Sequence, residues 1–136
     1  MKELVLFYSY SGNTKKIAEK FAQENNFDIF EVADKKKPNK FVAYTAGIVK
    51  VMRNGVFAVI PPAVKFEEYD IINIFAPVWA DHPAPSMNAA LKMLPKGAKI
   101  KLFMVSHSGK SGEESVSKRI GDLGLEIIGY ENIKNV

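Results

Sequence analysis

The sequence of 136 residues contains no cysteine, which excludes disulfide bonds, thiolate metal sites and a cysteine nucleophile. No apolar run approaches the ~18 residues that a membrane-spanning helix requires, so we predict no membrane span. The first ten residues, MKELVLFYSY, lack the long apolar segment and cleavage site of a signal peptide. We therefore expect a cytoplasmic protein, and the length favours a single domain over 1–136.

Histidine and glycine are also too sparse for several common sites. His82 and His107 are the only histidines, too few on their own to favour a metal site. The G-x-S-x-G pattern of many serine hydrolases is missing. Gly12 stands alone in the first strand-to-helix turn, where a dinucleotide fingerprint needs three glycines. A Walker A loop ending in Gly109-Lys110-Ser111 fails, because Met104 occupies the position of its first glycine.

The charge is moderately basic, with 19 basic and 15 acidic residues and a net charge of +4. Part of the excess is local, in KKKPNK at 35–40. Such a patch is compatible with nucleic-acid binding or with a solvated loop. We favour the loop, because no arginine or aromatic residue is interleaved with the lysines.

Strand-like and helix-like segments alternate along the chain. Apolar runs predict strands at 3–8, 27–32, 70–76, 99–105 and 125–133, and amphipathic spacing predicts helices at 13–25, 40–53, 86–94 and 113–123, with Ser86 as a cap. This alternation predicts an α/β protein with a parallel sheet and helices on both faces. Ligands of such sheets bind beyond the carboxyl ends of the strands, which selects a first loop (9–14), a second loop (77–85) and a third loop (106–112).

The first loop, SYSGNT, favours phosphate binding. The N-terminus of the helix that follows presents free backbone N–H groups, and the hydroxyls of Ser9, Ser11 and Thr14 add further donors. Simple capping of the helix by Ser11 or Asn13 is the alternative. In the second loop, PVWADHPAP, Trp79 indicates either a planar ligand or a core anchor. The third loop, SHSGKSG, offers further hydroxyl and backbone N–H donors.

Together these loops resemble those of the flavodoxin family. SYSGNT is similar to the family's phosphate loop, residues 67–91 to its third strand, P-x-W-type flavin loop and next helix, and 106–112 to its second flavin loop. The resemblance implies a flavodoxin-like three-layer sandwich with a five-stranded parallel sheet of order 2-1-3-4-5. It implies FMN as the cofactor, with no metal and no catalytic residue, and this set of binding residues: Ser9, Tyr10, Ser11, Gly12, Asn13 and Thr14 around the phosphate, and Pro77, Val78, Trp79, Ala80, Ser106, His107, Ser108 and Gly109 around the flavin.

The implied function is electron transfer through bound flavin, to a partner protein or a small acceptor. A small NAD(P)H-dependent FMN reductase is an alternative, although no nicotinamide motif is visible. A flavin-free interaction module is another, because Asp81 stands where relatives often carry glycine and the family's last helix is absent. That absence predicts an open sheet face near Leu125, Ile127 and Ile128, and we expect a second copy to cover it as a homodimer.

Overall fold

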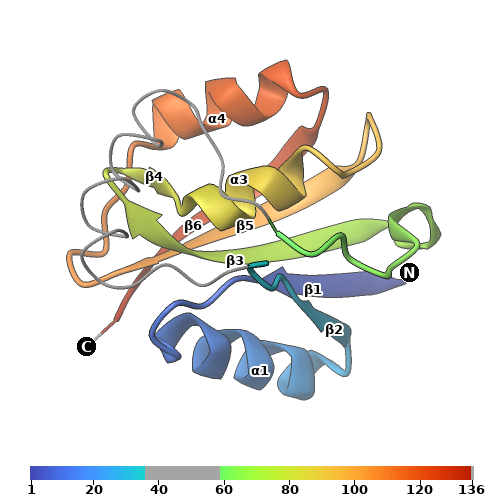
Figure 1. The fold of residues 1–136 in the computed structure, drawn as a ribbon, viewed down its shortest axis with the longest axis horizontal. Coiled ribbons are helices and arrows are strands. Elements are labelled where there is room, and N and C mark those ends of the chain that lie inside the picture. The colour runs from blue at the N-terminus through green and yellow to red at the C-terminus, as the bar shows by residue number, and fades with distance from the viewer. Residues whose placement is uncertain (36–58, 136) are drawn as a thin grey trace.

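A computed structural model describes residues 1–35 and 59–135. The chain folds as an α/β flavodoxin-like sandwich in which helices cover both faces of a mainly parallel sheet (Figure 1). The predicted helix at 40–53 and the lysines at 36–40 lie outside the described residues. Within the described ranges, no helix is long and apolar enough to cross a membrane.

The sheet has the order β2-β1-β3-β5-β6, and these five strands pair in parallel. Their bounds are Glu3–Phe7 for β1, Asp28–Glu31 for β2, Ile71–Trp79 for β3, Lys99–Ser106 for β5 and Glu126–Lys134 for β6. When the five parallel strands are numbered along the chain without the short β4, this is the predicted order 2-1-3-4-5. It is extended by β4 (His82–Pro83), a short strand that the sequence did not predict and that pairs antiparallel with the end of β3.

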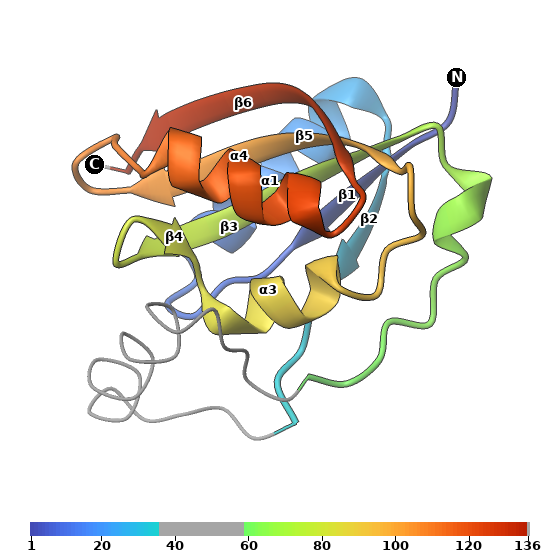
Figure 2. The same cartoon turned by 90° about the horizontal axis from the view of Figure 1, so that it is seen from above.

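The helices follow the predicted amphipathic segments. Helix α1 (Asn13–Asn25) lies on one side of the sheet, and α3 (Pro85–Leu91) and α4 (Glu113–Asp122) lie on the other (Figure 2). A 3-10 turn, η1 (Phe66–Glu68), precedes β3. Helix α3 begins at Ala84 and Pro85, and no side chain caps it, so the predicted capping role of Ser86 is wrong. Proline supplies the start instead, because its fixed φ suits the first helical position.

The two faces of the sheet carry cores of different kinds. Under α3 and α4, aliphatic residues of β1, β3 and β5, such as Leu6, Ile74 and Leu102, form the larger cluster with Met87 and Ile120. Under α1 the smaller cluster is aromatic, and the rings of Phe75 and Phe103 stack with centroids 4.3 Å apart and an interplanar angle of 5°. Phe21 from α1 packs on both rings, at centroid distances of 5.2 and 5.3 Å.

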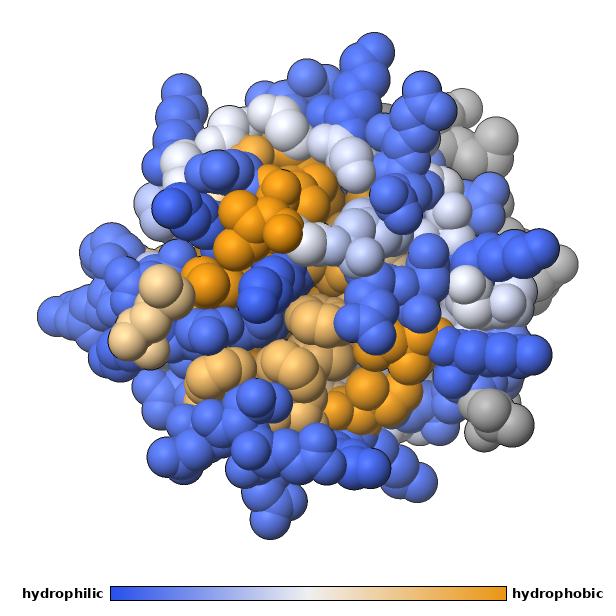
Figure 3. All heavy atoms as spheres, turned by 180° about the vertical axis from the view of Figure 1, so that it is seen from behind, coloured by the Kyte–Doolittle hydropathy of each residue, from blue (hydrophilic) through white to orange (hydrophobic). Residues whose placement is uncertain are grey.

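The sheet face at β6, which was predicted to be open, is only partly exposed. Leu125 and Ile127 pack against the larger cluster, which corrects their assignment to an uncovered face, while Ile128 is 41% exposed. On the α1 side a groove of about 330 Å³ lies beside Phe103 and includes the polar residues Lys101 and Glu131. Seen from behind, hydrophobic atoms gather in the middle of the molecule with hydrophilic side chains around them (Figure 3). The homodimer stays a prediction.

Candidate functional site

The three loops selected from the sequence all follow carboxyl ends of parallel strands, at one edge of the sheet. The first follows β1, the second begins within the last residues of β3 and the third begins at the last residue of β5. Because β1, β3 and β5 are neighbours in the sheet, the three loops lie side by side. The structure therefore brings together the predicted binding residues, which are far apart in the sequence.

The first loop is a tight turn that ends in an uncapped helix. Gly12 has φ 100° and precedes α1, and its N–H donates to Ser9 Oγ over 3.0 Å. A positive φ of this kind favours glycine, since a Cβ would be strained there. Neither Ser11 nor Asn13 caps α1, and its first turn contains no acidic side chain. The capping alternative is therefore wrong.

The start of α1 has the features of an anion site. The first N–H groups of a helix lack intrahelical acceptors, and the helix dipole favours negative charge at that end. Ser11 and Asn13 are exposed beside these groups, whereas Thr14 is buried. The hydroxyl oxygen of Ser9 accepts a hydrogen bond within its own loop, and its hydroxyl proton can donate to a ligand.

The second loop is a β-hairpin rather than the irregular loop that its composition predicted. Pro77, Val78 and Trp79 belong to β3, and the register pairs Trp79 with His82 of β4. Ala80 and Asp81 form the turn, with φ values of 48° and 67°. Two successive positive φ angles are typical of a type I′ turn, which usually contains asparagine or glycine. We call residues 79–82 the Trp79 hairpin.

An aromatic contact links the first loop to the Trp79 hairpin. The rings of Tyr10 and Trp79 meet edge to face, with centroids 5.8 Å apart and an interplanar angle of 83°. Both side chains are partly exposed at this edge. Trp79 is therefore neither a fully buried core anchor nor an isolated surface residue, and its ring can contact a planar ligand beside the start of α1.

The third loop is organised by its own serines. Ser106 Oγ accepts hydrogen bonds from the N–H groups of Gly109, over 3.0 Å, and Lys110, over 3.2 Å. His107 and Ser108 are exposed, and His107 Nδ1 lies 3.2 Å from the carbonyl oxygen of Asn135. Ser108 Oγ also accepts from the N–H of Lys110, over 3.2 Å, so both serines support the turn, although Ser108 and His107 are exposed.

The second and third loops are joined directly. The N–H of Gly112 donates to the carbonyl of Asp81 over 2.8 Å, and a Cβ on Gly112 would lie only 3.3 Å from Asp81 Cβ. His82 Nε2 lies 3.4 Å from Ser115 Oγ of α4, while its buried Nδ1 has no hydrogen-bond partner. Burial, and then the positive charge of Arg119, lower the pKa of His82. At neutral pH the imidazole is therefore uncharged.

A partly buried hydrogen-bond cluster under the first two loops was not predicted from the sequence. Tyr8 and Ser86 both donate to the carboxylate of Asp34, which follows β2 at the same edge of the sheet. The sequence carried one usable signal, the position of Asp34 after the carboxyl end of a strand. Ser86 gave the opposite signal, because serine near a helix start is usually a cap.

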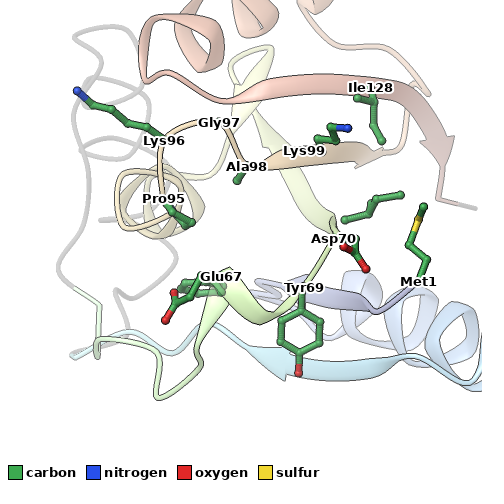
Figure 4. A pocket seen from close by; sticks show the side chains of 12 residues that line it. Met1, Glu67, Tyr69, Asp70, Pro95, Lys96, Gly97, Ala98, Lys99 and Ile128 are labelled. Atoms are coloured by element: carbon green, nitrogen blue, oxygen red, sulfur yellow. The ribbon is translucent and has the colours of Figure 1, made fainter.

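One further feature lies away from this edge. A groove of about 610 Å³ is found at the opposite edge, near the amino ends of β3, β5 and β6, and Figure 4 shows Lys96 pointing away from it. Its lining mixes the acidic Asp70 and Glu67 with Lys99 and apolar residues, without a converging set of donors. Among the described residues, no cluster of histidine, aspartate and glutamate is arranged to hold a metal ion.

Solved structures share this fold across almost the whole chain. A flavoprotein from Lactobacillus acidophilus, solved in complex with FMN, superposes with a TM-score of 0.79 at 24% identity, covering 98% of this chain and 93% of that one. A Bacteroides eggerthii protein assigned as a flavoprotein gives a TM-score of 0.77 at 21% identity, covering 98% and 90%. A similarly assigned protein from Bacteroides uniformis gives 0.76 at 19% identity, covering 95% and 88%. No protein-family model and no curated protein matches the sequence.

Proposed function

We propose that this protein binds FMN at the edge formed by the three loops and transfers electrons through the flavin. The observation that carries the proposal is the uncapped start of α1, next to a loop of hydroxyl residues and beside Trp79. A helix start without a cap or an acidic side chain suits a phosphate group. The likeness in fold to a flavoprotein solved with FMN supports the choice of ligand.

The residues present fit the two parts of FMN. The N–H groups at the start of α1, with Ser11 and Thr14, would hold the phosphate through neutral donors. Trp79, with Tyr10 against its edge, would pack on the flavin ring. The exposed Ser108 and His107 would border the ring from the third loop. FMN itself supplies the redox chemistry, while these side chains bind it, orient it and limit its contact with water.

Asp81 would affect the reduction potential of the bound flavin. Its carboxylate is exposed in the turn of the Trp79 hairpin. A negative charge at that place would oppose the gain of negative charge on the flavin. We therefore expect Asp81 to lower the reduction potential of bound FMN, and Asp81→Asn to raise it.

The first test is a visible absorption spectrum of the purified protein, followed by titration with FMN. Flavin bands, or saturable FMN uptake, are expected. Ser11→Ala together with Thr14→Ala removes two neutral hydrogen bonds and should weaken binding by about tenfold to a hundredfold. Ser117→Ala, a hydroxyl removed from the body of α4, is the matched control and should leave the affinity unchanged. A folded, colourless protein that ignores FMN would overturn the proposal and favour the interaction module.

The role as an electron carrier needs a separate test. The sequence shows no nicotinamide motif, so the FMN-loaded protein should accept electrons from a chemical reductant and return them to an oxidant. It should not oxidise NAD(P)H steadily in the presence of a quinone. Continuous turnover with NAD(P)H would instead assign the protein as a reductase.

A further inference from the structure

The carboxylate of Asp34 connects two hydroxyl groups from different elements. Tyr8, at the end of β1, donates from its hydroxyl to Asp34 Oδ2 over 2.8 Å. Ser86, in the first turn of α3, donates to Asp34 Oδ1. Tyr8 is 2% exposed and Ser86 is fully buried, so both hydroxyls depend on partners within the protein.

The chemistry of this cluster defines the direction of its hydrogen bonds. Burial, and then the hydrogen bond to Asp34, raise the pKa of Tyr8 well above its ordinary value. Tyr8 therefore remains protonated and donates, and Asp34 accepts. A hydrogen bond to a charged acceptor is stronger than one between neutral groups, so two such bonds on one carboxylate form a firm junction.

The junction lies between the two loops that would hold opposite ends of FMN. Tyr8 immediately precedes Ser9, the first residue of the first loop. Ser86 follows the short strand β4, and the N–H of Ala84 donates to the carbonyl of Pro77 over 3.1 Å, which ties the start of α3 to β3. Asp34 thus links the base of the first loop to the base of the Trp79 hairpin.

Asp34 is itself anchored by the backbone. The N–H of Val32 donates to the carbonyl of Phe7 over 2.7 Å, and the N–H of Ile60 donates to the carbonyl of Ala33 over 2.8 Å. Asp34 also forms a backbone bridge with Val59. The carboxylate therefore occupies a defined place at the sheet edge, and its two partners take their positions from it.

We propose that Asp34 is a positioning residue that sets the first loop relative to the Trp79 hairpin, and thereby the affinity for a ligand that contacts both. The proposal rests on the proposed function for its ligand, FMN. A ligand with two attachment points gains affinity only when both are correctly spaced. Riboflavin lacks the phosphate, so it depends far less on the spacing between the two loops.

The ligand experiment compares FMN with riboflavin in Asp34→Ala, Asp34→Asn and the unaltered protein, below the melting temperature of each. Asp34→Ala should weaken FMN binding by about tenfold or more and riboflavin binding by less than about twofold. Asp34→Asn keeps the shape and one acceptor oxygen, so its affinity for FMN should lie between that of Asp34→Ala and that of the unaltered protein. Tighter FMN binding by both variants would mean that the Asp34 charge only repels the phosphate, and would overturn the proposal.

Asp28→Ala is the matched control. Asp28 accepts a hydrogen bond from the hydroxyl of Tyr69 over 2.8 Å, but at the amino end of β2, away from the loops. The control removes another carboxylate–tyrosine hydrogen bond, an exposed one, and it should leave the ratio of FMN to riboflavin affinity unchanged. Equal loss of both ligands in Asp34→Ala would indicate general destabilisation and would count against positioning.

A second readout requires no ligand. Trp79 is the only tryptophan, and its edge contact with Tyr10 reports how the first loop lies against the hairpin. In folded Asp34→Ala we expect a red shift of its fluorescence and greater quenching by acrylamide, with neither change in Asp28→Ala. An unchanged Trp79 signal would overturn the positioning role even if FMN binds. A protein that ignores FMN but shows the Trp79 changes would overturn the proposed function and keep the positioning role.

Discussion

The turn of the Trp79 hairpin places two residues with a Cβ in the left-handed region, and relief of that strain can be measured. Ala80 has φ 48° and is exposed, so Ala80→Gly removes a methyl group that makes few contacts. A left-handed conformation costs a residue with a Cβ about 1–2 kcal/mol. Glycine loses about 0.4–1 kcal/mol through the greater freedom of the unfolded chain. The difference between these two ranges means that Ala80→Gly should stabilise the protein by up to about 1.6 kcal/mol.

A matched substitution separates the two contributions. Ala63 is also exposed, but its φ is not positive, so Ala63→Gly should only destabilise, by about 0.4–1 kcal/mol. The difference between the two variants then gives the strain alone, about 1–2 kcal/mol. Thermal unfolding followed by circular dichroism is sensitive enough, since each kcal/mol shifts the melting temperature by roughly 3–5 °C in a domain of this size.

If Ala80→Gly and Ala63→Gly destabilise equally, the left-handed turn stores no strain. Asp81→Gly should stabilise less than Ala80→Gly, because aspartate tolerates the left-handed region better than alanine does. A larger gain at Asp81 would mean that relief of charge repulsion, rather than backbone strain, dominates at this turn.

Three other outcomes are expected. Phe103→Ala removes one ring of the stack with Phe75 and should cost about 3–5 kcal/mol in urea unfolding, whereas a loss below about 1 kcal/mol would contradict the packing described. Gly109→Ala should destabilise by about 1–2 kcal/mol in the same assay, because its φ is 69° and a Cβ would lie 3.2 Å from Lys134 Cβ; an unchanged midpoint would contradict this. The lowered pKa of His82 means that the unfolded chain binds the proton more readily, so this residue's contribution to stability is complete above pH ~6.5 and falls as the pH drops below that value. His82→Phe should flatten the pH dependence below pH ~6.5, and an unaltered slope would exclude His82 as its source.

Much of the fold followed from apolar patterning. The continuous apolar run at 3–8 predicted a strand buried on both faces, and the runs at 70–76 and 99–105 predicted two more strands. The alternation of strands and helices then restricted the connections to right-handed crossovers. These signals are local, and tertiary packing reinforced them rather than overriding them.

The parts that were missed depend on contacts between distant residues. Pro77 and Pro83 made the second loop look irregular, yet each lies in a strand at the end of the sheet. The turn of the Trp79 hairpin consists of Ala80 and Asp81, so it lacks the glycine that normally identifies a tight hairpin. Ser86 was expected to cap a helix and instead donates to Asp34, far away in the sequence. No local pattern encodes such a partner.

The aromatic cluster under α1 has a consequence for how this sequence can change over evolutionary time. In the aliphatic cluster, a methyl group lost at one position can be replaced by one gained at a neighbour, so single steps carry a small cost. Phe21, Phe75 and Phe103 contact one another as three rings, and a ring lost from one position leaves a gap that no added methyl group at a neighbour fills. Descendants of this chain should therefore drift freely on the α3 and α4 side, and should keep the three phenylalanines or exchange them together.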